Sequence, residues 1–353
     1  MEKVLVKLEN VSKKFDRDYV IKDFSLDIYE GEFLTLLGPS GCGKTTVLRM
    51  ISGLETVTKG RVYIDSVDVT NVDATKREVN TIFQNLALFP KMTVTENISF
   101  GLRMKKVPQN EINKRVRDVI KLVKLTGLEE RYPAELSGGQ QQRVAIARGI
   151  VMNPKVLLLD ESLCSLDLKL KKSMQVELKK IQKKLGITFI YVTHAQDEAL
   201  SMSDRIVIIN KGRIEQMGTP EEIYRHPNTI FVADFIGEAN IIDAKVIRGG
   251  DEAVVSINDN YMVKVNNTID MKKDEMIKLI VRPENVLVYK REKKDSLKGV
   301  INTTTYSGDS TKLTVSITDE LSINAQVIDE DKYKDDEIVY LDFDENFIVP
   351  LRS

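Results

Sequence analysis

A glycine-rich turn at residues 38–46 constrains the fold of this chain more than any other stretch. It reads Gly-Pro-Ser-Gly-Cys-Gly-Lys-Thr-Thr, directly after the apolar run 33–37 and directly before the apolar segment 47–51. This order predicts a strand, a phosphate-binding loop and a helix, because glycines let backbone N–H groups converge on an anion and a helix N-terminus attracts negative charge. The alternative, a glycine-rich loop with an unrelated lysine, leaves the flanking strand and helix unexplained.

The polar groups of this loop have expected tasks in binding phosphate groups and Mg²⁺. We expect Lys44 to reach the β- and γ-phosphates and the Thr45 hydroxyl to ligate Mg²⁺. The loop residues expected to contact the nucleotide are Gly38, Pro39, Ser40, Gly41, Cys42, Gly43, Lys44, Thr45 and Thr46. The sequence therefore predicts an α/β P-loop NTPase domain.

Two later apolar runs end in polar residues suited to metal and water chemistry. Residues 79–83 are followed by Gln84, and residues 156–159 by Asp160 and Glu161. In α/β sheets, ligands bind beyond the carboxyl ends of the strands. We therefore expect Gln84 and Asp160 at the Mg²⁺ site, with Glu161 as the general base that polarises the attacking water. The alternatives are a surface amide for Gln84 and a helix-capping role for the two acids.

A third strand end carries a histidine. The run 187–192 is rich in strand-forming residues and is followed by Thr193 and His194. The other histidine, His226, lies in an Arg-His-Pro sequence typical of a surface turn. A lone histidine is usually structural, but one that follows a strand of this sheet is better interpreted as a sensor of the γ-phosphate.

Residues 91–150 change character and predict a helical subdomain. Near its end, Ser137 precedes Gly138, Gly139 and Gln140 at the start of a helix. A serine N-cap followed by glycines leaves N–H groups available to an anion, so this helix start predicts a second phosphate site.

Composition limits the location and the partners of the chain. Its net charge of −1 gives no sign of a nucleic-acid partner. Its two cysteines, Cys42 and Cys164, do not form a disulfide framework and favour a reducing compartment. Residues 1–6 lack signal-peptide features, and no apolar run approaches the roughly 20 residues that span a bilayer. We expect a cytoplasmic protein with, at most, a peripheral membrane role.

The ordered motifs resemble the nucleotide-binding subunit of ABC transporters over roughly residues 1 to 237. The resemblance implies that Phe15 stacks on adenine, although a lone aromatic near a strand is more often a core residue. It also implies a head-to-tail dimer of two copies, with each ATP between the phosphate loop of one copy and the signature helix of the other. The residues implied to contact nucleotide outside the phosphate loop are Phe15, Ser137, Gly138, Gly139, Gln140 and Asp167.

The segments 79–84, 87–90, 160–163 and 235–238 are similar to the ATPase subunit of bacterial spermidine/putrescine importers. Ser162 favours this group, because many other ABC import ATPases have proline there. The departures from the family pattern are Asn85, Leu86, Cys164, Ser165 and Ala195. Iron, sulfate, sugar and betaine importers use similar ATPases, so these solutes remain alternatives.

The resemblance implies partners that this chain does not contain. These are two integral-membrane permease subunits and, indirectly, an extracytoplasmic solute-binding protein, which would hold this chain at the cytoplasmic face of the membrane. Gln84 would couple the metal site to the permeases, and the apolar residues 86–90 would receive them. Two other classes are alternatives. A DNA-repair ABC ATPase carries a coiled coil, for which the segment after Gln84 has no room, and a soluble P-loop kinase or GTPase has no use for residues 136–140.

Residues 240–353 predict an all-β domain built of small barrels, because short alternating runs are separated by Gly-Gly-Asp, Asn-Asp-Asn and Ser-Gly-Asp turns. The Val-Arg-Pro-Glu sequence at 281–284 resembles the OB-like, TOBE-type accessory domain of importer ATPases. Acidic segments at 329–331, 335–337 and 342–345 predict a solvated rim, with a regulatory polyamine site as the alternative.

Overall fold

The computed structural model describes residues 3–161, 167–250, 252–258, 261–266, 268–328 and 333–352. Ser162, Cys164, Ser165 and the acidic segment 329–331, which entered the sequence interpretation, lie outside these described residues. By its internal contacts the chain forms two compact units, Met1–Pro220 and Glu221–Ser353, called unit 1 and unit 2 below.

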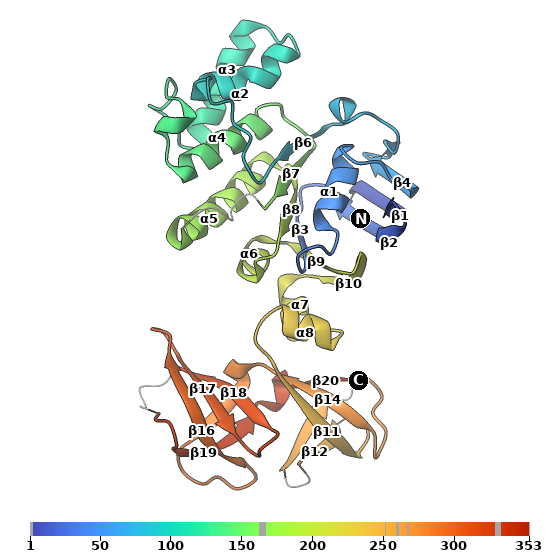
Figure 1. Ribbon diagram of the computed structural model, residues 1–353, viewed down its shortest axis with the longest axis vertical. Helices are drawn as coiled ribbons and strands as arrows, with labels where there is room; N and C mark the ends of the chain where they lie inside the picture. The colour runs from blue at the N-terminus through green and yellow to red at the C-terminus, as the bar shows by residue number, and fades with distance from the viewer. Residues whose placement is uncertain are drawn as a thin grey trace. The chain divides into compact units, whose positions relative to one another are not determined.

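Unit 1 is organised around a six-stranded sheet in the order β10-β9-β3-β8-β7-β6 (Figure 1). Five strands are parallel, and β10 joins β9 as an antiparallel hairpin partner. The strands are β3 (Phe33–Leu37), β6 (Val79–Ile82), β7 (Val156–Asp160), β8 (Thr188–Thr193), β9 (Arg205–Asn210) and β10 (Arg213–Gly218). Strands β3 and β8 are buried along their whole length, as expected for a parallel sheet covered on both faces.

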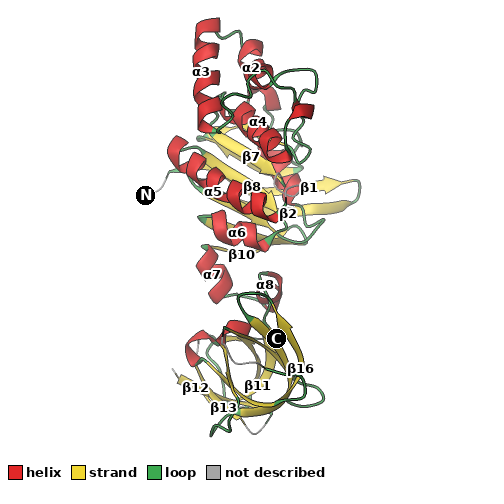
Figure 2. Cartoon of the chain, turned by 90° about the vertical axis from the view of Figure 1, so that its left-hand side faces the viewer, coloured by secondary structure: helices red, strands yellow, loops and turns green. Residues whose placement is uncertain are grey.

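The two faces of this sheet serve two hydrophobic cores, because successive side chains of a strand point to opposite sides. In β7, Leu157 and Leu159 contribute to one core and Val156 and Leu158 to the other. Helices α5 (Leu168–Leu185) and α6 (Gln196–Met202) lie along one face (Figure 2), and α1 (Lys44–Ser52) packs into the core on the other. The predicted α/β class is confirmed.

A second, antiparallel sheet of unit 1 covers α1. Its order is β2-β1-β4-β5, and several of its residues belong to the same core as Val47 and Leu48 of α1. The strands are β1 (Val4–Phe15), β2 (Asp18–Tyr29), β4 (Lys59–Ile64) and β5 (Val67–Asp68).

The expected helical subdomain contains α2 (Val94–Met104), α3 (Gln109–Leu122) and α4 (Gly138–Ile150). Helix α2 begins with a capping box in which the Thr93 side chain and the Glu96 side chain each satisfy a backbone N–H of the other. In α3, Ile112, Val116 and Ile120 are buried at the spacing of one helix face. Within the part of the chain that the structure describes, no helix combines the length and the apolar character needed to cross a membrane.

Unit 2 consists of two five-stranded antiparallel sheets that share one core. The first has the order β13-β12-β11-β14-β20 and comprises β11 (Asn240–Arg248), β12 (Glu252–Ile257), β13 (Tyr261–Asn266), β14 (Met276–Val281) and β20 (Val349–Leu351). The second has the order β15-β19-β16-β17-β18 and comprises β15 (Val286–Tyr289), β16 (Leu297–Tyr306), β17 (Thr311–Ser316), β18 (Ser322–Val327) and β19 (Ile338–Phe343). The predicted all-β domain is confirmed.

Two short helices, α7 (Pro220–Arg225) and α8 (Ile230–Phe235), precede these sheets, and all their residues except Pro220 group with unit 2. Arg282, at the end of β14, makes the connection, since its guanidinium donates to the carbonyl oxygens of Tyr224, Ala233, Gly237 and Glu238 at 2.9 to 3.1 Å. The sequence-based end of the nucleotide-binding domain near residue 237 stays a prediction.

Candidate functional site

The phosphate loop connects β3 to α1 through a tightly packed turn. Gly41 and Gly43 have φ values of 78° and 107°, a region that favours glycine. A Cβ atom on Gly38 would lie 2.2 Å from the carbonyl oxygen of Ile209, and one on Gly43 would lie 2.4 Å from Cδ1 of Ile21. The loop therefore requires glycine both for its backbone angles and for its close approach to neighbouring strands.

The donor groups of this loop suit an anion. Gly43 is the N-cap of α1 and has no side chain to satisfy the first N–H groups of the helix, so a phosphate can bind them. The Lys44 side chain is 5% exposed, and its Nζ donates to the carbonyl oxygens of Gly38 and Pro39 at 2.8 and 2.9 Å. Lys44 is thus held over the loop, where it adds a positive charge to the converging N–H groups.

A pair of oxygen ligands lies beside the loop. Thr45 Oγ1 donates to Asp160 Oδ1 at 3.2 Å, which joins the start of α1 to the end of β7. Burial raises the pKa of Asp160, and the neighbouring Glu161 charge raises it further, while the bond from Thr45 opposes the shift. A hydroxyl and a partly desolvated carboxylate are ligands that Mg²⁺ prefers, so these residues fit the metal.

Three predicted catalytic side chains meet at the ends of three neighbouring strands. Gln84 follows β6, Glu161 follows β7 and His194 follows β8. Gln84 Nε2 donates to Glu161 Oε2 at 3.3 Å, and His194 Nδ1 lies 3.3 Å from Glu161 Oε1. The Glu161 backbone N–H donates to the Val192 carbonyl at 3.0 Å, and its φ of 43° lies in the left-handed region. Glu161 thus lies between an amide and an imidazole.

The predicted second phosphate site forms the start of α4. The Ser137 hydroxyl accepts from the Gln140 backbone N–H at 3.4 Å, and the Gln140 side chain accepts from the Ser137 N–H at 2.9 Å. Ser137 and Gly138 are exposed, whereas Gly139 is buried against Leu170 of α5. Within the chain Ser137 and Gln140 therefore satisfy each other, and Ser137 is exposed while Gln140 is partly buried.

Phe15 and Asp167 have clearly defined surroundings. The Phe15 side chain, at the end of β1, is 43% exposed, and Lys13 Nζ lies 4.8 Å from its ring centroid. Phe15 is therefore not the core aromatic that the sequence left as an alternative. Asp167 caps α5 by accepting from the Leu170 backbone N–H at 3.0 Å, a role that sequence reasoning did not assign to it.

Glu198 is a site-supporting residue that the motifs did not indicate. It is fully buried in α6, and its Oε2 accepts from the Tyr191 hydroxyl and, at 2.5 Å, from Thr193 Oγ1. Its Oε1 forms an ion pair with Lys171 Nζ of α5 at 2.8 Å. Thr193 Oγ1 in turn accepts from the backbone N–H of Ala195, so Glu198 orders the segment around His194. The only sequence signal for it is an acid in the first turn of the helix after the histidine.

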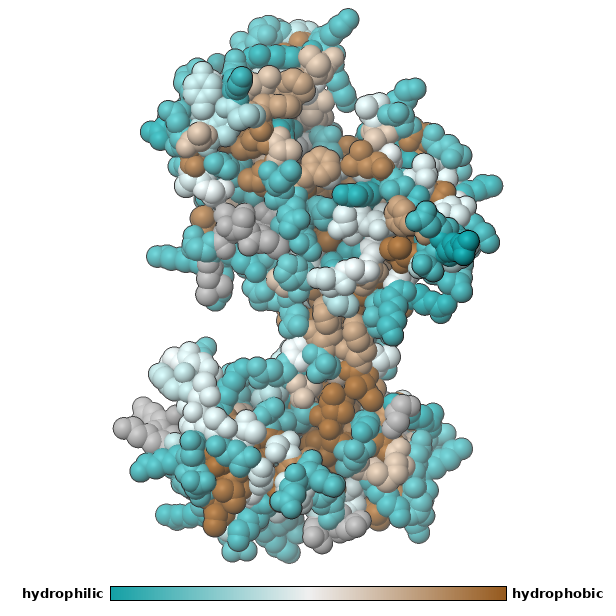
Figure 3. Space-filling model, in the orientation of Figure 1, coloured by the Kyte–Doolittle hydropathy of each residue, from teal (hydrophilic) through white to brown (hydrophobic). Residues whose placement is uncertain are grey.

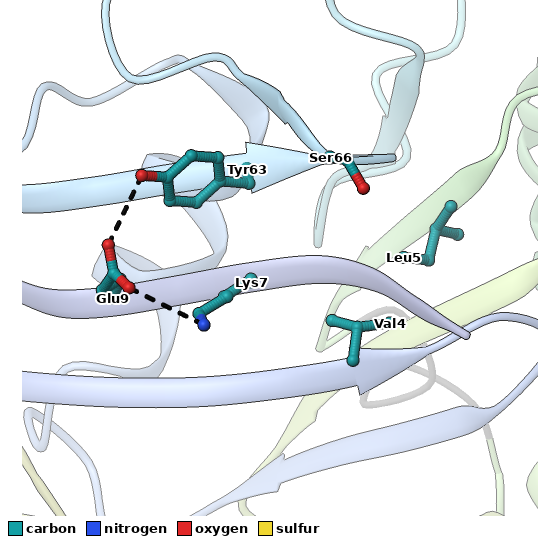
Figure 4. Close-up of a pocket in the computed structure, with 6 residues that line it drawn as sticks. All are labelled: Val4, Leu5, Lys7, Glu9, Tyr63 and Ser66. Carbon is teal, nitrogen blue, oxygen red and sulfur yellow. Dashed lines mark hydrogen bonds and ion pairs between the residues drawn. The ribbon is translucent and has the colours of Figure 1, made fainter. Parts of the chain in front are cut away.

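A separate pocket of about 280 Å³ lies on the antiparallel sheet (Figure 4). Glu9 is paired there with Lys7 at 3.7 Å and accepts from the Tyr63 hydroxyl at 3.4 Å. The lining residues are Val4, Leu5, Lys7, Glu9, Tyr63 and Ser66. None of these residues belongs to the predicted nucleotide site.

Family models match both parts of the chain. The ABC transporter model matches residues 21–164, which include the phosphate loop, Gln84, the Ser137 helix start and the Asp160-Glu161 pair. The TOBE domain model matches residues 279–350 of unit 2.

Curated relatives are similar over most of the chain. The spermidine/putrescine import ATP-binding protein PotA of Aggregatibacter actinomycetemcomitans is 50% identical over 317 residues, which cover 89% of this chain and 85% of the relative. The PotA proteins of Haemophilus influenzae and Aliivibrio fischeri are 49% and 52% identical, over 89% and 87% of this chain and 85% and 83% of those relatives.

Solved structures resemble part of the chain. The cbiO1 protein of Clostridium perfringens, part of an ABC transporter complex, matches with a TM-score of 0.59 and 31% identity over 63% of this chain and 91% of its own. An ATP-binding cassette solved as a dimer with ADP and phosphate matches with a TM-score of 0.55 and 34% identity over 61% of this chain and 99% of its own.

Proposed function

The chain belongs to the ABC transporter family, among the spermidine/putrescine import ATP-binding proteins, and from this premise we propose that it hydrolyses ATP to drive polyamine uptake through separate membrane subunits. Membership in this group sets aside the DNA-repair and kinase alternatives. The observation that carries the proposed chemistry is the convergence of Gln84, Glu161 and His194 beside the Thr45–Asp160 pair.

The chain's own residues divide the work of hydrolysis. Lys44 and the N–H groups of residues 38–46 bind the phosphates of ATP. Glu161 accepts the proton of the attacking water, and Gln84 and His194, on either side of its carboxylate, orient that carboxylate and the water. Mg²⁺, held by Thr45, Asp160 and Gln84, would neutralise the charge on the phosphate oxygens.

Two copies of the chain form the working unit in this proposal. Ser137, Gly138 and Gly139 would bind the γ-phosphate held by the second copy, with Gln140 and Asp167 at the same interface and Phe15 stacked on the adenine of its own copy. Exposure of Ser137, Gly138 and Phe15 supports this arrangement, because a shared site needs these groups at the surface. The similarity to a cassette solved as a dimer supports it as well.

The membrane partners are two permease subunits, with a solute-binding protein acting from the other side of the membrane and this chain peripheral at the cytoplasmic face. Apolar side chains gather on one face of unit 1 where the helical subdomain meets the sheet (Figure 3). Phe83, directly before Gln84 and the segment 86–90, is 38% exposed. An exposed apolar surface beside a catalytic glutamine suits a partner helix.

Transport assays test the proposed solute. A strain that lacks this chain should lose energy-dependent uptake of labelled spermidine and putrescine, and the intact chain should restore it. The variant Glu161→Gln, expressed at the same level, should not restore uptake, because it keeps the binding surfaces but lacks the general base. Normal polyamine uptake in the deletion strain, with loss of iron, sulfate, sugar or betaine uptake instead, would refute the polyamine assignment.

A further inference from the structure

The loop between β6 and α2, residues 83–92 and called the Gln84 loop below, contains two consecutive residues in the left-handed region. Leu86 and Ala87 have φ values of 56° and 46°. This region is unfavourable for residues with a Cβ atom, so surrounding contacts must hold it in place. The Leu86 side chain is buried, whereas Ala87 is exposed. The contacts that hold Ala87 in this conformation therefore involve its backbone.

Arg148 of α4 provides these contacts. Its Nη2 donates to the Leu86 carbonyl and its Nη1 to the Ala87 carbonyl, both at 2.7 Å. The guanidinium also lies 5.4 Å from the ring centroid of Phe89. A planar fork with two parallel donors fits two successive carbonyl groups, whereas a lysine ammonium is a single point charge.

Helix α2 also holds this loop. The Asn97 side chain is fully buried, accepts from the Phe89 N–H at 2.8 Å and donates to the carbonyls of Phe89, Met92 and Thr93 at 2.9 to 3.1 Å. Since α2 and α4 pack against each other, residues 86–93 are attached to the helical subdomain.

Gln84, only two residues before Leu86, is attached to the catalytic centre instead. Its amide donates to Glu161 Oε2 at 3.3 Å. A single residue, Asn85, therefore separates a contact with the general base from a contact with the helix that begins at Ser137. Any displacement of α4 relative to the sheet must be taken up by this short link.

We propose that Arg148 is a positioning residue that couples the signature helix α4 to the Gln84 loop, so that movement of Ser137 toward nucleotide in a second copy shifts Gln84 and the adjoining surface for the membrane subunits. This inference rests on the proposed transport function. Two observations carry it: Arg148 donates to two carbonyl groups of the Gln84 loop, and Gln84 in the same loop donates to Glu161.

The test compares Arg148→Lys with Arg143→Lys. Arg143 lies on the same helix, but it contacts the Val123 carbonyl at 3.1 Å and Glu177 at 2.7 Å, away from the Gln84 loop. In proteoliposomes that contain the full transporter, we expect Arg148→Lys to import about 5- to 150-fold less spermidine per ATP hydrolysed, the usual range of coupling between two sites. Arg143→Lys should keep the wild-type ratio. An unchanged ratio in Arg148→Lys, or a parallel loss of hydrolysis and import, would overturn the proposal.

A second measurement needs no membrane partner and no transported solute, so an incorrect solute assignment does not affect it. Amide hydrogen exchange on the full chain should be faster at Leu86 and Ala87 in Arg148→Lys than in the wild type or in Arg143→Lys, because their local structure depends on the hydrogen bonds from Arg148. Equal exchange in the two variants would contradict the role of Arg148 even if polyamine transport is established.

Discussion

Asp160 lies half-buried at the end of β7, and burial raises the pKa of its carboxyl group. An acid whose pKa is higher in the folded than in the unfolded state binds protons more readily when folded, so the stability of the fold falls as pH rises through the interval between the two values. Asp65 shows the opposite case, since hydrogen bonds from Lys155 and Lys3 lower its pKa to about 2. The site residue therefore reduces the stability of the ligand-free protein at neutral pH.

Substitution of Asp160 and of Asp65 tests their opposite effects on the stability of the fold. At pH 7 and without nucleotide, Asp160→Asn should melt at or above the wild-type temperature, and this advantage should shrink as pH falls toward the ordinary carboxyl range. Asp65→Asn should melt slightly below the wild type. With Mg²⁺ and ATP at about 100 times the dissociation constant, the wild type should gain about 2.7 kcal/mol, and Asp160→Asn much less. Thermal scans by calorimetry check all three; a ligand-free Asp160→Asn that melts well below the wild type would contradict the burial argument.

At the scale of elements, the end of β14 controls how the two short helices associate with unit 2. Arg282 is 4% exposed and donates to four carbonyl groups in or next to α7 and α8. Its guanidinium also stacks 4.3 Å from the ring centroid of Tyr224. The Val-Arg-Pro-Glu sequence therefore has a structural role, because its arginine satisfies the carbonyls that the end of α8 leaves open.

Removal of this guanidinium should destabilise unit 2. Arg282→Ala leaves several carbonyl groups without a donor, and we expect a loss of about 3 kcal/mol, with a smaller loss for Arg282→Lys. Lys278→Ala, which removes only an ion pair with the exposed Asp243 at 2.7 Å, should cost less than about 1 kcal/mol. Urea unfolding of the full chain measures the difference in the free energy of unfolding between the two variants. Limited proteolysis near residues 225–240 measures the difference locally. Equal midpoints for Arg282→Ala and Lys278→Ala would show that the arginine is not needed.

At the scale of the whole molecule, the proposed site is complete only in a pair of copies. Glu161, Gln84 and His194 meet within one chain, whereas Ser137 makes its capping contacts with Gln140 and exposes its outer side. ATP should therefore join two chains, and a chain that binds but cannot hydrolyse ATP should remain joined.

Light scattering with the general-base variant tests this dimer. Glu161→Gln should hydrolyse ATP about 10²- to 10⁴-fold more slowly and become a stable dimer when ATP is added. Adding Ser137→Ala should abolish that dimer. Thr93→Ala in the Glu161→Gln background is the matched control, because it removes a similar capping box worth about 1 kcal/mol from α2 without touching the proposed interface. A dimer that survives Ser137→Ala, or hydrolysis by a monomer at the wild-type rate, would refute the shared site.

The acidic segments of unit 2 contain carboxylates that form ion pairs with lysines. Among the described residues, Asp342 pairs with Lys293 at 2.6 Å and Glu337 with Lys290 at 3.5 Å. These carboxylates already have cationic partners, which supports the interpretation as an ordinary solvated surface over a regulatory polyamine site.

The features that depend on neighbours along the chain could be predicted from sequence: the strand, glycine turn and helix around Lys44, the capped start of α4 at Ser137, and the polar residues after β6, β7 and β8. Parallel strands end at the same edge, so Gln84, Glu161 and His194 were predictable as a group once the strands were recognised. Three contacts could be learned only from the folded chain: Arg148 binds a loop 62 residues away, Glu198 joins β8 to α5, and Arg282 binds α8 from 49 residues along the chain. These contacts depend on how finished elements pack, and periodicity and spacing carry no information about which distant backbone a side chain will reach.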